Sequence, residues 1–251
     1  MRRRAVYTLV HNESIFLPIW LTYYSRYFDY SDIYVIDHQS TDGSTTKLPC
    51  NVIQVTHEFV HDDLFMHEMI TKFQYRLLEG YKYVLYVDCD EFVYHQDGLD
   101  AYIDSMDRPC IMANGYELVH MRNREAPINL SQPILNQRNY WIRSKYYSKP
   151  VLSAIPFYWG IGRHGAENGG YFDENFFLLH LKRMDYDIAL KKNELTAVSN
   201  ISPINKKYAW GYQCWLTGQG FDSWFYTDFY PNYLDAHIEP IIDKVKKFMP
   251  L

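Results

Sequence analysis

The sequence predicts an α/β fold with a mostly parallel central sheet flanked by helices, and two observations support this prediction. Short apolar runs alternate with segments of helical periodicity through the first 120 residues, which is typical of βαβ units. After that point the pattern loosens into long loops. We therefore expect a single domain over residues 1–251, with a regular half at 1–120 and an irregular half at 121–251.

The expected elements follow one another along the chain. Strands are expected at the apolar runs 4–10, 31–37, 50–55, 81–88 and 110–120. Helices are expected where apolar residues recur at helical spacing, over 13–28, 62–80, 98–106 and, in the second half, 185–198. Asn12 or Ser14 could cap the first helix, and Asp62 or Asp63 the second, with Gly80 just beyond its end.

Composition excludes several classes of protein. The net charge of −5 and the pI near 6.0 argue against a nucleic-acid partner. The basic runs at residues 1–4 and 244–247 are interpreted as surface charge, with a peripheral contact to anionic lipid as the alternative. The four cysteines form no C-x-x-C pair, and no leader or membrane-spanning run is evident, so we expect a cytoplasmic protein.

The segment KYVLYVDCDEFVYH (82–95) carries the strongest chemical signal. It runs from an apolar strand into three acids, Asp88, Asp90 and Glu91. Carboxylates at a strand end repel one another and are costly to desolvate, so a positive charge should lie beside them. Asp88 and Asp90 flank one residue and would face the same way in an extended segment.

Polar residues also follow the other strands of the first half. Asn12 and Glu13 follow the first strand, and Asp37 ends the second. Parallel strands place their carboxyl ends on one edge, where open α/β sheets bind ligands, so these residues should meet Asp88 and Asp90 there. Mg²⁺ or Mn²⁺ typically takes one or two carboxylates and completes its shell with water and phosphate oxygens, which suits a D-x-D pair.

Several motifs together resemble one family. Over about the first 95 residues, the chain resembles the subgroup of family-2-like glycosyltransferases with the motifs N-E-x-x-x-L-x-x-W-L and D-x-D-E-F. The matching segments are HNESIFLPIWL, then an aspartate and STDG, and then DCDEF. SKPVL, GRHGAE and LLHLKR resemble its later markers. The resemblance implies a GT-A (Rossmann-like) fold with an acceptor region in its irregular half. It also implies transfer of sugar from a nucleotide-diphosphate sugar, a UDP-sugar first, to a glycan, lipid-linked sugar or protein acceptor. Inverting transfer is the first expectation, and retaining transfer stays open.

The resemblance implies roles for individual residues. Asn12, Glu13 and Asp37 match positions at the base and ribose of the nucleotide. Asp88 and Asp90 match the site of Mn²⁺ or Mg²⁺ and the diphosphate. Glu91 would orient its neighbours or bind sugar. His180 would be a third metal ligand or an ordinary strand-end histidine. Asp42 would cap the next helix. His38 replaces the usual second acid beside Asp37 and puts base recognition in doubt.

Inverting transfer needs a carboxylate base, and Glu167 in the glycine-rich segment RHGAENGG is the first choice. Asp173, Asp185 and Glu117 are the alternatives. His164 could bind sugar or phosphate, or cap the loop. The basic side chains of Lys149 and Arg163 could offset phosphate charge.

Other functions remain open from the sequence alone. A dehalogenase-type phosphatase also has D-x-D after an apolar strand, but its strand is typically the first, and Phe92 stands where it has Thr or Val. A nucleotidylyltransferase would need a basic, glycine-rich loop where HNES stands. A non-catalytic sugar- or nucleotide-binding module is the alternative from another class. Five tryptophans of the second half could stack on a sugar acceptor or fill the core: Trp141, Trp159, Trp210, Trp215 and Trp224.

Overall fold

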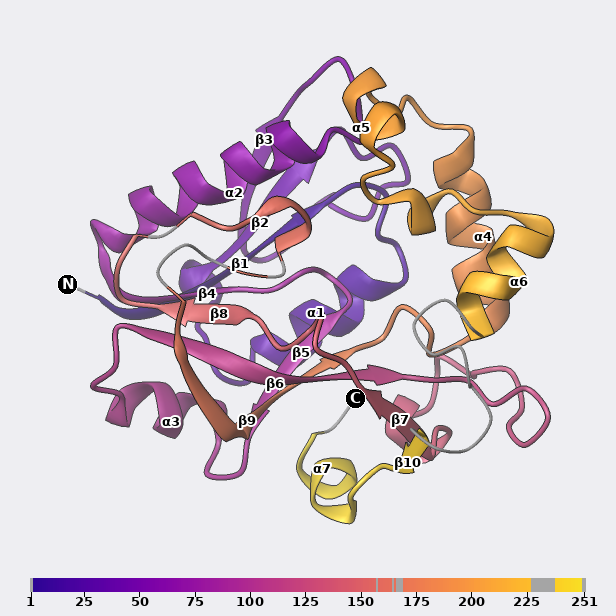
Figure 1. Cartoon of the computed structure of the whole chain (residues 1–251). Helices are drawn as coiled ribbons and strands as arrows, with labels where there is room; N and C mark the ends of the chain where they lie inside the picture. Colours follow the sequence, from indigo (N-terminus) through magenta and orange to yellow (C-terminus); the bar gives the residue numbers. More distant parts are fainter. Residues whose placement is uncertain (1, 157, 164, 166–168, 227–237, 250–251) are drawn as a thin grey trace.

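The computed structural model describes residues 2–156, 158–163, 165, 169–226 and 238–249, and within these one mixed sheet of ten strands organises the molecule (Figure 1). The strands are β1 (Arg2–Val10), β2 (Ile33–His38), β3 (Asn51–Val55), β4 (Tyr81–Tyr86), β5 (Glu91–His95), β6 (Cys110–Leu118), β7 (Tyr140–Arg143), β8 (Pro150–Ser153), β9 (Tyr171–His180) and β10 (Ile238–Pro240). The helices are α1 (Phe16–Tyr24), α2 (Asp63–Leu78), α3 (Leu99–Ser105), α4 (Tyr186–Ala197), α5 (Pro203–Tyr208), α6 (Gly218–Tyr226) and α7 (Asp243–Phe248).

The α/β class is confirmed, but the expectation of a mostly parallel sheet is wrong. The strand order is β10-β7-β6-β8-β4-β1-β2-β3, with β9 paired to both β5 and β6. Parallel pairing joins β3, β2, β1 and β4, as the repeated βα pattern predicts, and recurs between β6 and β9. The other five pairings are antiparallel. Antiparallel partners need no intervening crossover helix, so the second half shows no regular alternation in its sequence.

Helices cover both faces of the parallel part. Alternate residues of β1 point to opposite faces, so Val6 packs in the cluster that contains α1, whereas Tyr7 packs in the cluster that contains Ile70 of α2. Asp62 caps α2 as expected, since its side chain accepts from the Phe65 amide. The other capping prediction is wrong. No side chain caps α1 from Asn12 or Ser14, because the Ser14 amide bonds Asp42 of the turn after β2.

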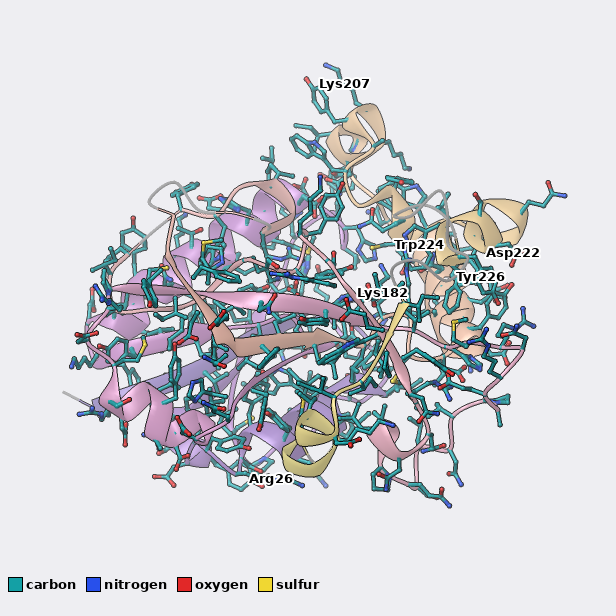
Figure 2. All side chains as sticks on the ribbon, turned by 60° about the horizontal axis from the view of Figure 1, so that its bottom comes forward. Arg26, Lys182, Lys207, Asp222, Trp224 and Tyr226 are labelled. Carbon is teal, nitrogen blue, oxygen red and sulfur yellow. The ribbon has the colours of Figure 1, made fainter. Side chains whose placement is uncertain are left out.

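The helices α4 and α6 of the second half follow β9 and lie close together, since Tyr186 of α4 packs on Phe221 and Phe225 of α6. Asp185 caps α4 by accepting from the amides of Asp187 and Ile188. Lys182 and Trp224 of α6 lie side by side in Figure 2, with the Lys182 ammonium 5.2 Å from the indole ring. No helix in the described part of the chain is long and apolar enough to cross a membrane.

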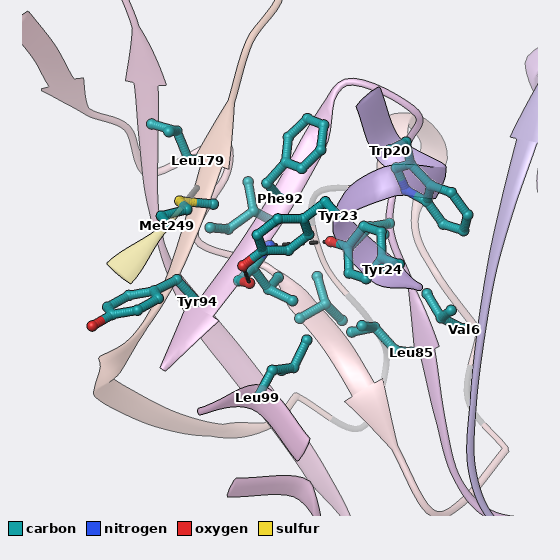
Figure 3. Close-up of a cluster of buried hydrophobic side chains, with 14 of the residues drawn as sticks. Val6, Trp20, Tyr23, Tyr24, Leu85, Phe92, Tyr94, Leu99, Leu179 and Met249 are labelled. Carbon is teal, nitrogen blue, oxygen red and sulfur yellow. Dashed lines mark hydrogen bonds between the residues drawn. The ribbon is translucent and has the colours of Figure 1, made fainter. Parts of the chain in front are cut away.

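β5, which the sequence did not predict, begins immediately after the acidic turn, and α1 supports it. All five of its residues are buried. The Tyr23 hydroxyl donates to the Val93 carbonyl (2.6 Å), and the Val93 amide donates to the Tyr24 hydroxyl (3.1 Å). The two tyrosines lie against Phe92 in Figure 3. Tyrosine hydroxyls thus satisfy backbone groups that β5 would otherwise bury unpaired.

Candidate active site

The strand-end acids lie in a tight turn between β4 and β5. The Glu91 amide donates to the Asp88 carbonyl (3.0 Å), and the Asp88 amide donates back to Glu91 Oε2 (2.9 Å). The Val87 amide still bonds the Tyr7 carbonyl of β1, so the turn starts directly at the sheet edge. The sequence prediction that the strand ends at these acids is confirmed.

Positively charged side chains neutralise Asp88 from two sides. Lys149 Nζ lies 3.3 Å from Asp88 Oδ2 and 2.7 Å from Glu91 Oε1. Arg163 Nε lies 3.2 Å from Asp88 Oδ1, and the Tyr86 hydroxyl donates to the same oxygen (2.6 Å). Lys149 and Glu91 are each 1% exposed. The charge that the acids require is therefore supplied in large part by the protein. Glu91 contacts Lys149 and the Asp88 amide, which favours the role of orienting its neighbours, and sugar binding by Glu91 stays a prediction.

Strand register explains how Lys149 reaches the acids. The antiparallel pairing of β4 with β8 sets Leu85 opposite Leu152. Continuing this register by three residues on each strand places Lys149 opposite Asp88. The chain before β8 also passes very close to β6, where a Cβ on Gly115 would lie only 2.1 Å from the Tyr147 carbonyl carbon. Gly115 is thus required for this approach.

The charged partner of Asp90 is His180, at the end of β9. The register of β9 pairs His180 with Glu91 of β5 and with Glu117 of β6. His180 Nε2 lies 3.5 Å from Asp90 Oδ1, and Nδ1 lies 2.9 Å from Glu117 Oε1. The Tyr147 ring stacks on the imidazole at 4.0 Å between centroids. His180 is therefore held by two carboxylates and an aromatic face.

These contacts fix the charges of the site near neutral pH. Burial would raise the pKa of Asp88 and of Asp90, but the charge of Arg163 on the first and of His180 on the second lowers both well below the usual range. Burial lowers the pKa of His180, but Glu117 and Asp90 together raise it to about 10. Both aspartates are therefore ionised, and His180 is an imidazolium.

The residues fit a divalent cation with few protein ligands. Asp88 and Asp90 are partly exposed oxygen donors, with side chains 23% and 12% exposed. The Glu117 contact aims His180 Nε2 toward Asp90, an arrangement common for metal-binding histidines, although His180 could ligate only after losing its proton. No group of three or more candidate ligands occurs among the described residues. Most of the coordination shell would thus come from water and a bound ligand.

The other strand ends lie on the same edge, as predicted. The register of β1 and β2 pairs Val10 with Asp37, so Asn12 and Glu13 follow at the edge where Asp88 also lies. Glu13 Oε1 is 2.6 Å from Lys192 Nζ of α4. Burial raises the pKa of Glu13, while Lys192 opposes that shift.

Asn12 and Asp37 make internal contacts. The Asn12 side chain accepts from the amides of Thr41 (2.7 Å) and Asp42, bracing the turn after β2. Asp37, 1% exposed, accepts from the Ser40 amide and from two further side chains of its surroundings. As placed, Asp37 holds this turn, and its contact with a base or ribose stays a prediction. The expectation that Asp42 caps the next helix is wrong, because β3 follows β2 directly; Asp42 instead accepts from the Ser14 amide and from the amide and hydroxyl of Ser44.

His38 lies inside the protein. It is fully buried, and neither ring nitrogen has a hydrogen-bond partner. Burial, with the nearby imidazoles of His11 and His57, lowers its pKa to about 4. The pKa of His61 is also lowered to about 4, by burial and by His11. His38 therefore cannot replace an acid as a direct base-recognition residue in this arrangement.

The alternatives to Glu167 as catalytic base already have other contacts. Glu117 binds His180 and the Arg183 amide, and Asp185 caps α4 and pairs with Arg138 at 3.1 Å. Asp173 lies near the start of β9, roughly 20 Å along the strand from His180. Glu117 and Asp185 thus have structural contacts and Asp173 lies far along the strand, and a base role for any of these three residues stays a prediction. Glu167 and His164 themselves lie outside the described residues.

The structure adds residues that sequence reasoning missed. Lys182 and Lys192 are close enough for their charges to lower the pKa of Asp90. Burial raises the pKa of Asp63, and Arg163 is close enough for its charge to oppose that shift. Lys182 stands two residues after His180, which is the spacing of side chains on one face of an extended segment. The sequence could therefore have predicted that Lys182 lies near the site. No sequence signal linked Lys192 to Glu13.

The tryptophans divide into two groups. Three of the candidates for acceptor stacking are each 2% exposed and fill the core: Trp141, Trp159 and Trp224. Trp210 and Trp215 are partly exposed, and Trp210 stacks on Tyr208 with 5.1 Å between centroids. Any acceptor platform among these five positions is therefore restricted to Trp210 and Trp215.

Comparisons with known proteins give only distant likenesses. No family model and no curated protein matches the chain. Among solved structures, residues 1–349 of TarS from S. aureus in complex with UDP-GlcNAc are 12% identical, with a TM-score of 0.40, covering 85% of this chain and 70% of that one. The same TarS segment without that ligand in its description is 14% identical, with a TM-score of 0.35, covering 85% and 69%. Likenesses this distant carry no argument about the site.

Proposed function

We propose that the protein is a metal-dependent glycosyltransferase that moves a sugar from a nucleotide-diphosphate sugar to an acceptor hydroxyl by inverting transfer. The observation that carries the proposal is the pair of carboxylates of Asp88 and Asp90 at the carboxyl edge of the parallel strands, with side chains 23% and 12% exposed. This edge is where open α/β sheets bind ligands. The ordered motifs around these acids support the same activity, with a UDP-sugar as the first candidate donor.

Each side chain has a proposed part in the reaction. Asp88 and Asp90 would hold Mn²⁺ or Mg²⁺, which supplies charge stabilisation for the leaving diphosphate. Asn12, Glu13 and Asp37 would form or support the pocket for the base and ribose. Glu167 is proposed to accept the proton of the attacking hydroxyl, with His164 near the sugar or phosphate. The acceptor would enter from the half at 121–251 and is proposed to be a glycan, a lipid-linked sugar or a protein.

One experiment separates this function from a non-catalytic binding module. The protein is incubated with a panel of nucleotide-diphosphate sugars, with Mn²⁺ and with excess EDTA, and release of free nucleoside diphosphate is measured. We expect release from one donor that depends on Mn²⁺. A thermal-shift screen of the same panel identifies the donor independently, because a bound ligand raises apparent stability by mass action. Binding of a donor without any turnover, with or without acceptor, would favour the binding module.

A further inference from the structure

Two basic side chains, Lys149 and Arg163, contact Asp88, and they differ in their exposure and in the number of carboxylates that each one contacts. Lys149 is 1% exposed and also contacts Glu91 at 2.7 Å, so it is fixed between two carboxylates. The Arg163 side chain is 19% exposed, and its ion pair in the described part of the chain is with Asp88 alone, at 3.2–3.4 Å. If Arg163 moves away it gives up one ion pair in the described part of the chain, whereas Lys149 would give up two and leave a buried Glu91 without its cation.

Backbone hydrogen bonds hold the described residues on the N-terminal side of Arg163 in a turn. The Arg163 amide donates to the Gly160 carbonyl (2.8 Å), and the Gly160 amide donates to the Gly165 carbonyl (2.8 Å). Gly162 and Arg163 both have positive φ, 75° and 62°, and the guanidinium contacts Asp88 of the acidic turn. A planar guanidinium binds a phosphate as well as it binds a carboxylate.

The contact between Arg163 and Asp88 also blocks a position that a divalent cation needs. Asp88 is the more exposed of the two aspartates, with 23% of its side chain accessible, and Arg163 lies against both of its carboxylate oxygens. Lys149 approaches only one of these oxygens, Oδ2. Removing the guanidinium would thus expose Oδ1, which still accepts from the Tyr86 hydroxyl through one lone pair, to a new ligand on its other side, while Lys149 and Tyr86 hold the carboxylate in place.

We propose that Arg163 exchanges between Asp88 and the diphosphate, and that this exchange couples cation binding to nucleotide binding. This inference rests on the proposed function. Without nucleotide, Arg163 and a divalent cation compete for Asp88, so the cation binds weakly. With a diphosphate present, Arg163 moves to the phosphate oxygens and leaves Asp88 free for the cation. Each ligand therefore raises the affinity for the other by the same factor.

The test is the variant Arg163→Gln, and it requires no turnover. Mn²⁺ binding is measured by electron paramagnetic resonance without nucleotide. Binding of UDP, GDP, CDP and ADP is measured by calorimetry in EDTA and with Mn²⁺. We expect Arg163→Gln to bind Mn²⁺ alone more tightly and the preferred diphosphate without metal more weakly, each by roughly 5- to 30-fold. The factor by which Mn²⁺ improves diphosphate affinity should shrink.

Controls separate the possible failures. Arg108→Gln removes an exposed arginine that pairs with Asp107 and lies over Tyr171, and it should change neither affinity. Arg163→Lys should be intermediate for Mn²⁺. If the wild type binds neither Mn²⁺ nor any of the four diphosphates, the proposed function fails. If both ligands bind but Arg163→Gln shifts their affinities in the same direction, or leaves them unchanged, the exchange is wrong and the proposed function stands.

Discussion

At the scale of single residues, burial separates side chains that the sequence presents as equivalent. Lys149 and Arg163 are both basic residues of the second half that were expected to offset phosphate charge. Lys149 is enclosed with Asp88 and Glu91, whereas Arg163 is partly accessible. Lys149 is 1% exposed and contacts both Asp88 and Glu91, so we expect it to position these acids rather than to contact a ligand directly.

Lys149→Met should therefore lower stability strongly. The substitution leaves the buried Glu91 carboxylate without its cation, and loss of one partner of a buried pair costs about 3–5 kcal/mol. Urea unfolding measures this cost. Lys145→Met, a change to an exposed lysine four residues earlier, should have little effect. The double variant Lys149→Met/Glu91→Gln should recover part of the loss, and a double variant less stable than Lys149→Met would contradict the pairing.

Asp90→Asn should remove activity with retention of the folded structure. The amide keeps the shape of the side chain but loses the charge that would hold a cation beside the diphosphate, and we expect transfer to fall at least about 100-fold. Circular dichroism should remain native-like. Asp97→Asn, at a side chain 70% exposed, is the control. Full transfer by Asp90→Asn, or undiminished wild-type transfer in excess EDTA, would contradict the cation requirement.

At the scale of elements, the sequence predicts the parts of the site that depend on local pattern. β1, β2 and β4 each form a short apolar run followed by polar residues, so Glu13, Asp37 and Asp88 could be assigned to one edge. The contacts of Lys149 and His180 could not be predicted, because they depend on antiparallel registers between strands far apart in sequence. The five residues of β5, which follow the acidic turn, also give no sequence signal that β9 is the strand with which β5 pairs.

The contact between α4 and the end of β1 is a separate element-scale feature. Lys192 reaches Glu13 across the two halves, and the side chains are 31% and 12% exposed. We expect a double-mutant cycle of Glu13→Gln and Lys192→Met to give a coupling energy of about 1–2 kcal/mol, less than for a fully buried pair because water screens Lys192. The exposed helical pair Glu68–Lys72 should give no more than about 0.5 kcal/mol. A smaller coupling for Glu13–Lys192 than for that control would contradict the contact.

At the scale of the whole molecule, the two halves share both the sheet and the charges of the site. β4 lies between β1 of the first half and β8 of the second, and β5 pairs with β9. The acids at the centre come mainly from the first half, and their cations come from the second: Lys149, Arg163, His180, Lys182 and Lys192. The acidic turn is therefore stabilised only when the chain beyond residue 121 has folded onto it.

Buried neutral histidines should set how the stability of the whole molecule depends on pH. His38 and His61 have pKa values of about 4 in the folded protein, below the value near 6.5 expected after unfolding. Between pH 4 and 6.5 the unfolded chain therefore binds more protons, and the free energy of unfolding rises with pH. The raised pKa of His180 acts in the opposite direction, but only above pH 6.5. The lowered pKa values of Asp88 and Asp90 act below pH 4.

We therefore expect stability to fall by roughly 1–3 kcal/mol between pH 7 and pH 5, allowing for partial solvent screening of His61. Urea unfolding of the metal-free protein across this range measures the slope directly. His38→Gln cannot take up a proton, so it should reduce the slope whatever its effect on stability at pH 7, because the slope counts protons rather than contacts. His38→Gln/His61→Gln should reduce the slope further. Smaller contributions should remain from His67, whose lowered pKa acts in the same direction, and from Glu13 and Asp63, whose raised pKa values act in the opposite direction. A slope in the double variant equal to that of the wild type would show that other groups take up the protons and that these two histidines are not held neutral.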